Sequence, residues 1–360
     1  MISRWYFQAD LPTWALFVEI ALAGFVVILS GSRLTRLADQ VATQFNLGGA
    51  WVGALLLATV TSLPEVVTGL TATWIGQVDM AFAAIFGSCS FNIVIIVLLN
   101  AVIGGGSILY GDKRRVHILS SSFGIVLISI AMLGVLSVSK FESNLRLAQA
   151  LEWLAVGMIA VTYILCMRMV YRTELEVSAE GGDVDQFRRT SGSPGLLPKV
   201  GLISLILVGS AWWLAKTGDV LADHHIEWIG RPLGATFVGF LFLALATSLP
   251  EIATGLSAVK IGNLDMALGN IFGSNMFNIF VIPFMKIASL LSGDALLMSG
   301  DDFHADRNII ACVVPILLTG VVIGAMSYRS SRRVLKRLGI DSALLALIYL
   351  AGMVLLLSSP

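Results

Sequence analysis

Two glutamates occupy identical surroundings in this sequence, 186 residues apart. Glu65 ends a Thr-Ser-Leu-Pro-Glu element, and Glu251 ends the same five residues. A second polar element follows each glutamate, Gly-Ser-Cys-Ser-Phe-Asn at 87–92 and Gly-Ser-Asn-Met-Phe-Asn at 273–278. Carboxylate, hydroxyl and amide oxygens are the hard ligands that Ca²⁺ prefers, whereas softer metals prefer Cys and His, which do not recur between the two copies. The recurring residues therefore predict a cation site built from oxygen atoms.

Both polar elements belong to one internal duplication. Residues 53–93 and 239–279 align without a gap, and 25 of their 41 positions are identical. In a chain this apolar, chance similarity would match mainly Leu, Ile, Val and Ala, yet here the polar and helix-breaking residues coincide. A duplication that preserves polar residues indicates a functional site where two repeats meet.

The composition is that of a membrane protein with many spans. Of the 360 residues, 57% are hydrophobic and 13% are charged, and the mean hydropathy is +0.87. The net charge is zero, and no basic block indicates a nucleic-acid partner. A helix needs about 20 apolar residues to cross a hydrocarbon core of about 30 Å. Ten such spans are predicted, near residues 11–30, 47–73, 79–102, 116–138, 147–170, 199–215, 233–259, 265–290, 308–326 and 341–358.

We therefore predict an all-α membrane protein with ten transmembrane helices in two halves of five. Because five is odd, the second half enters the membrane in the opposite orientation, and the two repeats are inverted. Such repeats form alternating-access transporters that bind their substrate near the midplane, between the repeats. Residues 1–171 are predicted to form the first five-helix repeat, 172–198 a cytoplasmic linker and 199–360 the second repeat.

The distribution of basic residues predicts the orientation. Sixteen of the 23 Lys and Arg residues lie in or beside one set of alternating loops, and the positive-inside rule places that set in the cytoplasm. Both termini then lie on the non-cytoplasmic side of a cell (inner) membrane. The first span has no small-residue cleavage site, so we expect it to remain as a helix.

Pro64 and Pro250 predict that each duplicated helix is interrupted. Proline removes a backbone donor and clashes with the carbonyl four residues earlier, so the first helix must loosen around Val60 and Thr61. A broken helix at membrane depth is tolerated where its carbonyl oxygens line a cavity. Counted at about 1.5 Å per residue from the turn that follows it, Glu65 lies about 15 Å deep, near the membrane centre.

The same residues also have simpler interpretations. Proline with Ser or Thr is a common kink in membrane helices. However, a carboxylate at the midplane costs about 3 kcal/mol, and none of the ten spans offers a Lys or Arg at matching depth, so a bound cation is the expected compensation. The duplicated glycines are interpreted as helix-packing positions, with Gly76 ending one helix, and Asp79 and Asp265 as helix caps. The adjacent His224 and His225 are interpreted as loop residues.

The two segments resemble the α-repeats of the calcium/cation antiporter superfamily, specifically the sodium/calcium exchanger branch. Those repeats carry Thr-Ser-x-Pro-Glu (or Asp) and Gly-Ser-Asn-x-Phe-Asn (or Asp) elements. The resemblance implies ten transmembrane helices with a central ion cluster formed by the second, third, seventh and eighth. It assigns Ca²⁺ binding, shared with Na⁺, to the two glutamates and the remaining shell to eight hydroxyl and amide residues. The implied metal ligands are Glu65, Glu251, Thr61, Ser62, Thr247, Ser248, Ser88, Asn92, Ser274 and Asn278.

Three departures from the family pattern stand out. The first repeat has Ala83-Ala84 where the second has Gly269-Asn270, and Cys89 where the second has Asn275, so the third helix is a degenerate copy. Asn278 stands where many microbial and potassium-dependent members have Asp, which argues against a K⁺ requirement. The predicted linker is too short for the calcium-sensing cytosolic domains of animal exchangers.

The resemblance implies a secondary active antiporter that exchanges Ca²⁺ for Na⁺ by alternating access, independently of K⁺ and without a resident cofactor. The main alternative is H⁺-coupled antiport of Ca²⁺ or another divalent cation, in which a midplane glutamate trades a proton for the metal. A channel would need a continuous oxygen-lined pore. The chain carries no His-Glu-x-x-His, Gly-x-Ser-x-Gly or paired-Asp protease element, so we expect no enzyme. The expected partners are the lipid bilayer and the transported ions Ca²⁺ and Na⁺, with no obligate protein partner.

Overall fold

A computed structural model describes most of the chain. The described residues are 13–45, 47–103, 108–110, 113–141, 143–180, 195–223, 225–226, 231–232, 247–294, 296–298, 303–328, 333–335 and 338–358. His224, the part of the predicted linker from 181 to 194 and the first part of the predicted seventh span, 233–246, lie outside them.

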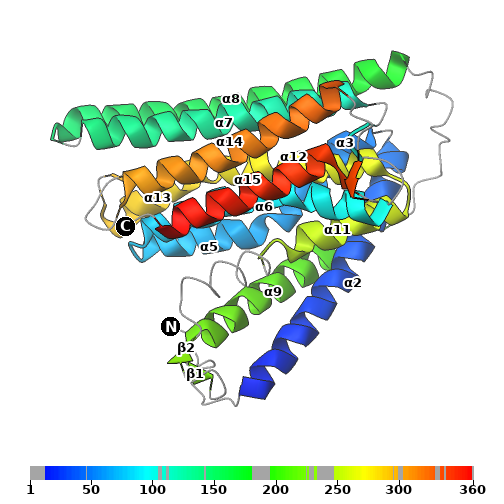
Figure 1. Ribbon diagram of the computed structural model, residues 1–360, viewed down its shortest axis with the longest axis horizontal. Helices are drawn as coiled ribbons and strands as arrows, with labels where there is room; N and C mark the ends of the chain where they lie inside the picture. Colours follow the sequence, from blue (N-terminus) through cyan, green and yellow to red (C-terminus); the bar gives the residue numbers. More distant parts are fainter. Residues whose placement is uncertain are drawn as a thin grey trace.

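Helices make up nearly all of the described chain (Figure 1). The first half contains α2 (Thr13–Phe45), α3 (Gly49–Val52), the π-helical turn η1 (Gly53–Leu57), α4 (Ala58–Thr61), α5 (Leu63–Trp74), α6 (Val78–Ile103), the 3₁₀ turn η2 (Ile108–Tyr110), α7 (Arg114–Lys140) and α8 (Leu145–Glu180). The second half contains α9 (Leu196–Asp223), α11 (Leu249–Lys260), α12 (Leu264–Phe280), α13 (Ile282–Ser292), α14 (Ala305–Tyr328) and α15 (Ile340–Ser358). Two short antiparallel pairs lie between helices: β1 (His225–Ile226) with β2 (Arg231–Pro232), and β3 (Arg333–Leu335) with β4 (Leu338–Gly339).

The predicted ten-helix fold is confirmed. Within the described residues, seven helices are long and apolar enough to cross a membrane, and the bent pair Gly49–Thr61 and Leu63–Trp74 forms an eighth span. The shorter apolar helix Ile340–Leu356 is the predicted tenth span, and α11 is the described part of the seventh. One boundary differs, because α8 continues to Glu180 and so enters the predicted linker as a helix.

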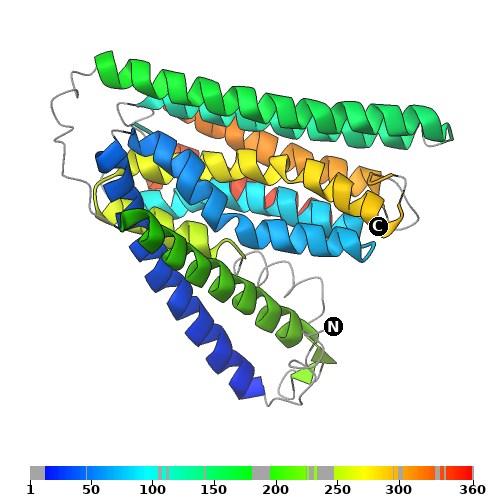
Figure 2. The ribbon, with the colours of Figure 1, turned by 180° about the vertical axis from the view of Figure 1, so that it is seen from behind.

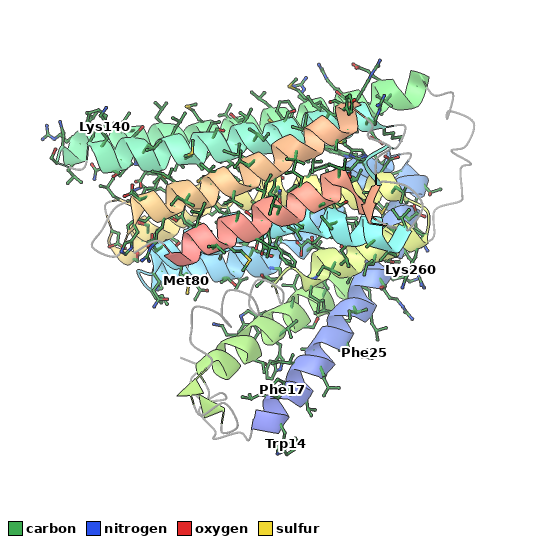
Figure 3. The ribbon with its side chains drawn as sticks, in the orientation of Figure 1. Trp14, Phe17, Phe25, Met80, Lys140 and Lys260 are labelled. Carbon is green, nitrogen blue, oxygen red and sulfur yellow. The ribbon has the colours of Figure 1, made fainter. Side chains whose placement is uncertain are left out.

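The arrangement of the helices follows the inverted repeat. Met80, just after the turn in the first copy, lies at one end of the helical block, and Lys260, just before the equivalent turn in the second copy, lies at the other (Figure 3). Helices α2 and α9, the first of each half, pack side by side and are inclined to the other helices, as Figures 1 and 2 show from both sides. The outward face of α2 is apolar, with Trp14, Phe17 and Phe25 all exposed, as expected for a surface in contact with lipid.

Both predicted helix interruptions are present. Ser62 leaves the helical conformation (φ −89°, ψ 3°) between α4 and α5, and Ser248 does the same (φ −90°, ψ 4°) immediately before α11. Pro64 and Pro250 are the second residues of the new helices, where a missing N–H is tolerated. The first interruption bends the span by 44°.

The turns after α5 and α11 are also equivalent. Gly76 and Gly262 both adopt φ of +80°, a left-handed conformation that favours glycine. In the first turn, Gln77 N–H donates to Ala72 O (2.8 Å), and in the second Asn263 N–H donates to Ala258 O (2.9 Å). The predicted role of Gly76 as a helix terminator is therefore confirmed.

The prediction that Asp79 and Asp265 cap helices is wrong. Asn263 caps α12 by accepting from Met266 N–H (3.1 Å). Each aspartate instead binds a histidine at the start of a helix in the opposite half, at α14 for Asp79 and at α7 for Asp265. Asp79 Oδ2 pairs with His304 Nδ1 (2.7 Å), and Asp265 Oδ1 pairs with His117 Nε2 (2.9 Å). A capping interpretation uses local sequence only, whereas these partners lie 225 and 148 residues away.

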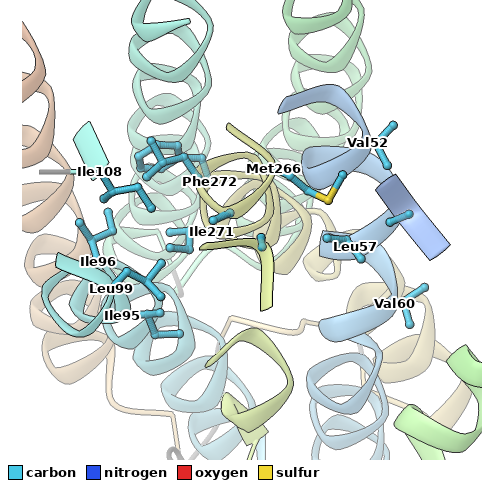
Figure 4. Packing of buried hydrophobic residues seen from close by; sticks show 14 of the residues in the cluster. Val52, Leu57, Val60, Ile95, Ile96, Leu99, Ile108, Met266, Ile271 and Phe272 are labelled. Carbon is cyan, nitrogen blue, oxygen red and sulfur yellow. The ribbon is translucent and has the colours of Figure 1, made fainter. Parts of the chain in front are cut away.

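Glycines let α12 approach the first broken helix at backbone distance. An added Cβ at Gly273 would lie 2.4 Å from Ala54 O, and one at Gly269 would lie 2.3 Å from Ala50 O. From the opposite side, a Cβ at Gly53 would lie 2.3 Å from Met266 O. The apolar packing around this contact joins Leu57 to α12 and α6 in one buried cluster, shown in Figure 4. The predicted packing role is thus confirmed for Gly273.

Gly273→Ala is expected to destabilise the protein by about 1–3 kcal/mol, because the methyl group overpacks a backbone contact that has no room for it. Thermal unfolding of the detergent-purified protein measures the effect. Gly157→Ala on α8 is the control, since a Cβ there meets nothing within 4 Å. Equal melting temperatures for the two variants would contradict the backbone contact.

Candidate cation site

The predicted ligands come from two broken helices and the two helices that follow them. All ten are buried, and none has more than 6% of its surface exposed. The interruptions place Ser62 and Ser248 at helix ends, where the hydroxyl groups are not committed to an unbroken helix. Helices α6 and α12 contribute Ser88 and Ser274 from equivalent positions, about three turns from the start of each helix.

Glu251 lies among hydroxyl groups from both repeats. Ser62 Oγ donates to Glu251 Oε1 (3.5 Å), although the two residues are 189 positions apart. Thr61 and Ser274 also lie next to the Glu251 carboxylate, and their own hydroxyl oxygens are 3.4 Å apart. The two repeats therefore interlock at this carboxylate.

Glu65 has a local hydroxyl partner and a nearby like charge. Ser88 Oγ donates to Glu65 Oε1 (3.5 Å) from the following helix of the same repeat. The two carboxylates, Glu65 and Glu251, lie close enough to interact electrostatically. Two buried carboxylates of like charge at short range repel one another, so this arrangement favours a cation between them.

Several buried oxygens of the predicted ligands are left without a hydrogen bond. On these ligands, the oxygens that have no hydrogen-bond partner among the described residues are Glu65 Oε2, Glu251 Oε2, Ser248 Oγ, Asn92 Oδ1 and Asn278 Oδ1. Each unsatisfied buried polar atom costs about 1–3 kcal/mol, so five within one set of predicted ligands require a common explanation. The donor set of carboxylate, hydroxyl and amide oxygens fits a hard cation.

Two further asparagines belong to this region and were not among the predicted ligands. Asn270 Oδ1 accepts from Thr61 Oγ1 (3.3 Å), and its Nδ2 donates to Thr254 Oγ1 (2.9 Å). Asn275 Oδ1 accepts from Asn92 Nδ2 (3.1 Å). Both asparagines stand at positions where the repeats differ, so a search for recurring residues passes over them.

One buried charge pair lies outside the candidate site. Lys286 of α13 and Glu152 of α8, both fully buried, form an ion pair. Glu152 Oε1 also accepts the backbone N–H groups of Leu297 and Met298 (2.7 Å each), and Lys286 Nζ lies 5.6 Å from the Trp153 ring centre. Glu152 is thus a buried carboxylate whose charge the protein itself compensates.

The fold and the site define a membrane transporter of cations that is built from inverted repeats. Residues 15–172 and 200–358 both match the family model described as sodium/calcium exchanger protein. This chain therefore belongs to the sodium/calcium exchanger family, within the calcium/cation antiporter superfamily. The two matched segments correspond closely to the two five-helix halves.

The similar proteins include one named for sodium-calcium exchange and one named for cation/proton exchange. The structure of the sodium-calcium exchanger NCX_Mj superimposes with a TM-score of 0.65 at 19% identity, over 94% of this chain and 98% of that one. Inner membrane protein YrbG of Escherichia coli is 25% identical over 71% of this chain and 74% of its own length. Vacuolar cation/proton exchanger 1a of rice, Oryza sativa subsp. japonica, is 23% identical over 76% and 62%, respectively.

Removing one member of the Lys286–Glu152 pair should be far more destructive than removing both charges. Lys286→Met leaves an uncompensated buried carboxylate and should cost about 3–5 kcal/mol, whereas Glu152→Gln/Lys286→Met should cost much less, because Gln keeps an oxygen for the two backbone donors. Thermal unfolding in detergent compares them. A double variant no more stable than Lys286→Met would show that the pair does not act through its charges.

Proposed function

We propose that this protein is a secondary active antiporter that exchanges Ca²⁺ for Na⁺ by alternating access, without a K⁺ requirement. The observation that carries the proposal is the set of five buried oxygen atoms without hydrogen-bond partners on the predicted ligands, two of them on the glutamates. The proposed metal ligands are the ten predicted residues: Glu65, Glu251, Thr61, Ser62, Thr247, Ser248, Ser88, Asn92, Ser274 and Asn278.

The charge of the site explains why transport would be an obligatory exchange. Without ions, two uncompensated carboxylates resist enclosure in a low-dielectric interior. One Ca²⁺ balances both charges, and several Na⁺ can do the same. Only loaded forms are then able to close on both sides and switch, so one ion cannot cross without the other.

The movement proposed for the switch is a displacement of α2 and α9 against the remaining helices. These two helices pack on each other and contact the core mainly through α11. That contact uses small residues and few hydrogen bonds: Gly31 lies against Ala253, and Thr35 Oγ1 donates to Thr254 O (3.3 Å). The small residues Gly31 and Ala253 leave no large side chain locked between the two helices at that point, which favours sliding.

Na⁺ is favoured as the coupling ion by the oxygens around each glutamate. A proton needs only the carboxylate, whereas Na⁺ needs several oxygen ligands, and Thr61, Ser62, Ser88 and Ser274 surround the two acids. The alternative is H⁺-coupled antiport of Ca²⁺ or another divalent cation. The likeness to a plant exchanger named for cation/proton exchange supports that alternative.

The cellular placement proposed here is the inner (cell) membrane, with both termini on the non-cytoplasmic side. The excess of Lys and Arg beside one set of loops supports this orientation. The likeness to an Escherichia coli protein named for the inner membrane supports the location. Residues 1–171 and 199–360 would then contribute one half-site each, joined on the cytoplasmic side by residues 172–198.

The coupling ion is tested by Ca²⁺ uptake into proteoliposomes that contain the purified protein. An outward Na⁺ gradient should drive uptake, and an outward H⁺ gradient of equal size should not. Uptake driven by the pH gradient alone would show that the coupling ion is H⁺ and not Na⁺. Liposomes without protein control for leak.

Glu65→Gln and Glu251→Gln should each abolish Na⁺-driven Ca²⁺ uptake to the level of liposomes without protein. The loss follows because one remaining carboxylate cannot balance Ca²⁺. Both variants should fold as well as wild type, since each removes a buried charge that lacks a protein counter-charge. Ca²⁺ uptake and thermal unfolding are measured on the same variants. Retained Na⁺-driven uptake would show that the glutamates are not the Ca²⁺ ligands, and a lowered melting temperature would show that they have a structural role.

The two amides predict independence from K⁺. Asn92 and Asn278 are neutral, so the site has no third carboxylate to balance K⁺ beside Ca²⁺. Wild-type uptake should not change when K⁺ replaces choline. Asn278→Asp should introduce K⁺ dependence, H⁺ dependence or a stall at neutral pH. A K⁺ requirement in the wild type, or a variant that behaves like the wild type across pH and K⁺, would show that the charge argument is wrong.

A further inference from the structure

The two repeats meet at residues 89 and 275, and they do so unequally. These positions are equivalent, and each side chain reaches the backbone of the other: Cys89 Sγ donates to Asn275 O (3.7 Å), and Asn275 Nδ2 donates to Cys89 O (3.0 Å). Both residues are buried. The contact is reciprocal about the pseudo-two-fold axis, but only the second repeat supplies an amide.

This contact dictates the orientation of the Asn275 amide. A backbone carbonyl only accepts hydrogen bonds, so the Cys89 carbonyl requires the Nδ2 end of Asn275 to face it. The Oδ1 end of Asn275 then faces Asn92, and an amide oxygen can only accept. Asn92 must therefore present its Nδ2 end, which donates to Asn275 Oδ1 (3.1 Å).

The oxygen of Asn92 is left facing away from this chain of hydrogen bonds. It is one of the buried oxygens that have no hydrogen-bond partner among the described residues. We propose that Asn275 is a positioning residue that fixes the Asn92 carbonyl oxygen as a preorganised Ca²⁺ ligand, acting through the amide orientation set by the Cys89 carbonyl. This inference rests on the proposed function of the same site.

The equivalent residue in the other repeat is not held in this way. Asn278 corresponds to Asn92, and its neighbour across the axis is the Cys89 thiol in place of an amide. Within the described part of the chain, neither Nδ2 nor Oδ1 of Asn278 has a hydrogen-bond partner. A thiol has no oxygen with which to fix the amide. The two halves thus supply one amide oriented by amide and carbonyl hydrogen bonds and one amide beside a thiol, which is a weak partner, and Asn92 carries the larger share of Ca²⁺ affinity.

The test measures Ca²⁺ binding directly, by calorimetric titration of the detergent-purified protein with CaCl₂ in Na⁺-free buffer. Asn275→Cys gives the second repeat the residue of the first and should raise the Kd for Ca²⁺ about 10-fold or more, as loss of a ligand-orienting partner does. In an Asn92→Ala background the same substitution should change Kd by less than about 2-fold, because the oxygen ligand through which Asn275 acts has been removed.

Two further variants separate positioning from stability. Asn100→Cys is the matched control: Asn100 is also buried on α6 and hydrogen-bonded at both ends, to Ser342 Oγ (3.2 Å) and Ile108 N–H (2.8 Å). It should lower the melting temperature without changing Kd. The swap Cys89→Asn/Asn275→Cys moves the amide to the first repeat, where it would orient Asn278, and should restore most of the lost affinity.

The inference is overturned if Asn275→Cys binds Ca²⁺ like the wild type, or if it weakens binding equally with and without Asn92. If Asn275→Cys alone cannot be purified, the swap decides: wild-type Kd supports orientation, and a Kd raised about 10-fold refutes it. Na⁺-driven uptake by the wild type is measured in parallel. If uptake is absent but the Kd values change among the variants as expected, the exchange function is rejected and the positioning role stands. If uptake is present but the Kd values do not change as expected, the positioning role is rejected and the exchange function stands.

Discussion

The helix breaks and close helix contacts of this structure follow from two buried carboxylates that have no counter-charge from the protein. Among the residues that the structure describes, no Lys, Arg or His forms an ion pair with Glu65 or Glu251. The same chain shows how a buried acid is stabilised permanently: Glu152 has a lysine and two backbone donors. Glu152 is thus a structural carboxylate, whereas the charge of Glu65 and Glu251 must be balanced by an ion that binds and dissociates.

The helix interruptions and the glycines are the architecture that such a pair requires. An unbroken helix would commit its carbonyl oxygens and turn its hydroxyl groups back on itself, as Thr73 Oγ1 does toward Gly69 O (2.8 Å). At Ser62 the break releases a hydroxyl to the opposite repeat. Backbone contact at Gly273 then brings α12 close enough for Ser274 to reach Thr61. Each element follows from the need to gather oxygen atoms around a charge in a low-dielectric interior.

Local chemistry in the sequence predicted the features that depend on few residues. Pro64 located the break to within one or two positions, and Gly76 located the turn, because each acts on its own backbone. The duplication identified the acids. Pairings across the molecule were not predictable in this way. Asp79 was expected to cap a helix, but its partner His304 is brought to it only by the packing of α14 against α6.

Asn275 illustrates the same limit within the site. A comparison of the two repeats identifies only residues that are present in both. A residue that is present in one repeat and acts on the shared site is therefore missed. The signal was present as a departure from the duplication, Cys89 against Asn275, and its meaning depended on knowing that these two residues face each other. Departures inside a duplicated motif therefore carry as much information as the identities once the fold is known.

The asymmetry extends from the site to the helices that are proposed to move. Asn270, which has only Ala84 as its counterpart, joins Thr61 to the hydroxyl of Thr254, and the carbonyl of Thr254 accepts from Thr35 of α2. A displacement of α2 along α11 must break the Thr35 bond or carry Thr254 with it. If Thr254 moves, Asn270 and the Thr61 hydroxyl beside Glu251 must also adjust. The second repeat thus links the moving helix to the cation site by direct hydrogen bonds, and Ala84 cannot make the same link in the first.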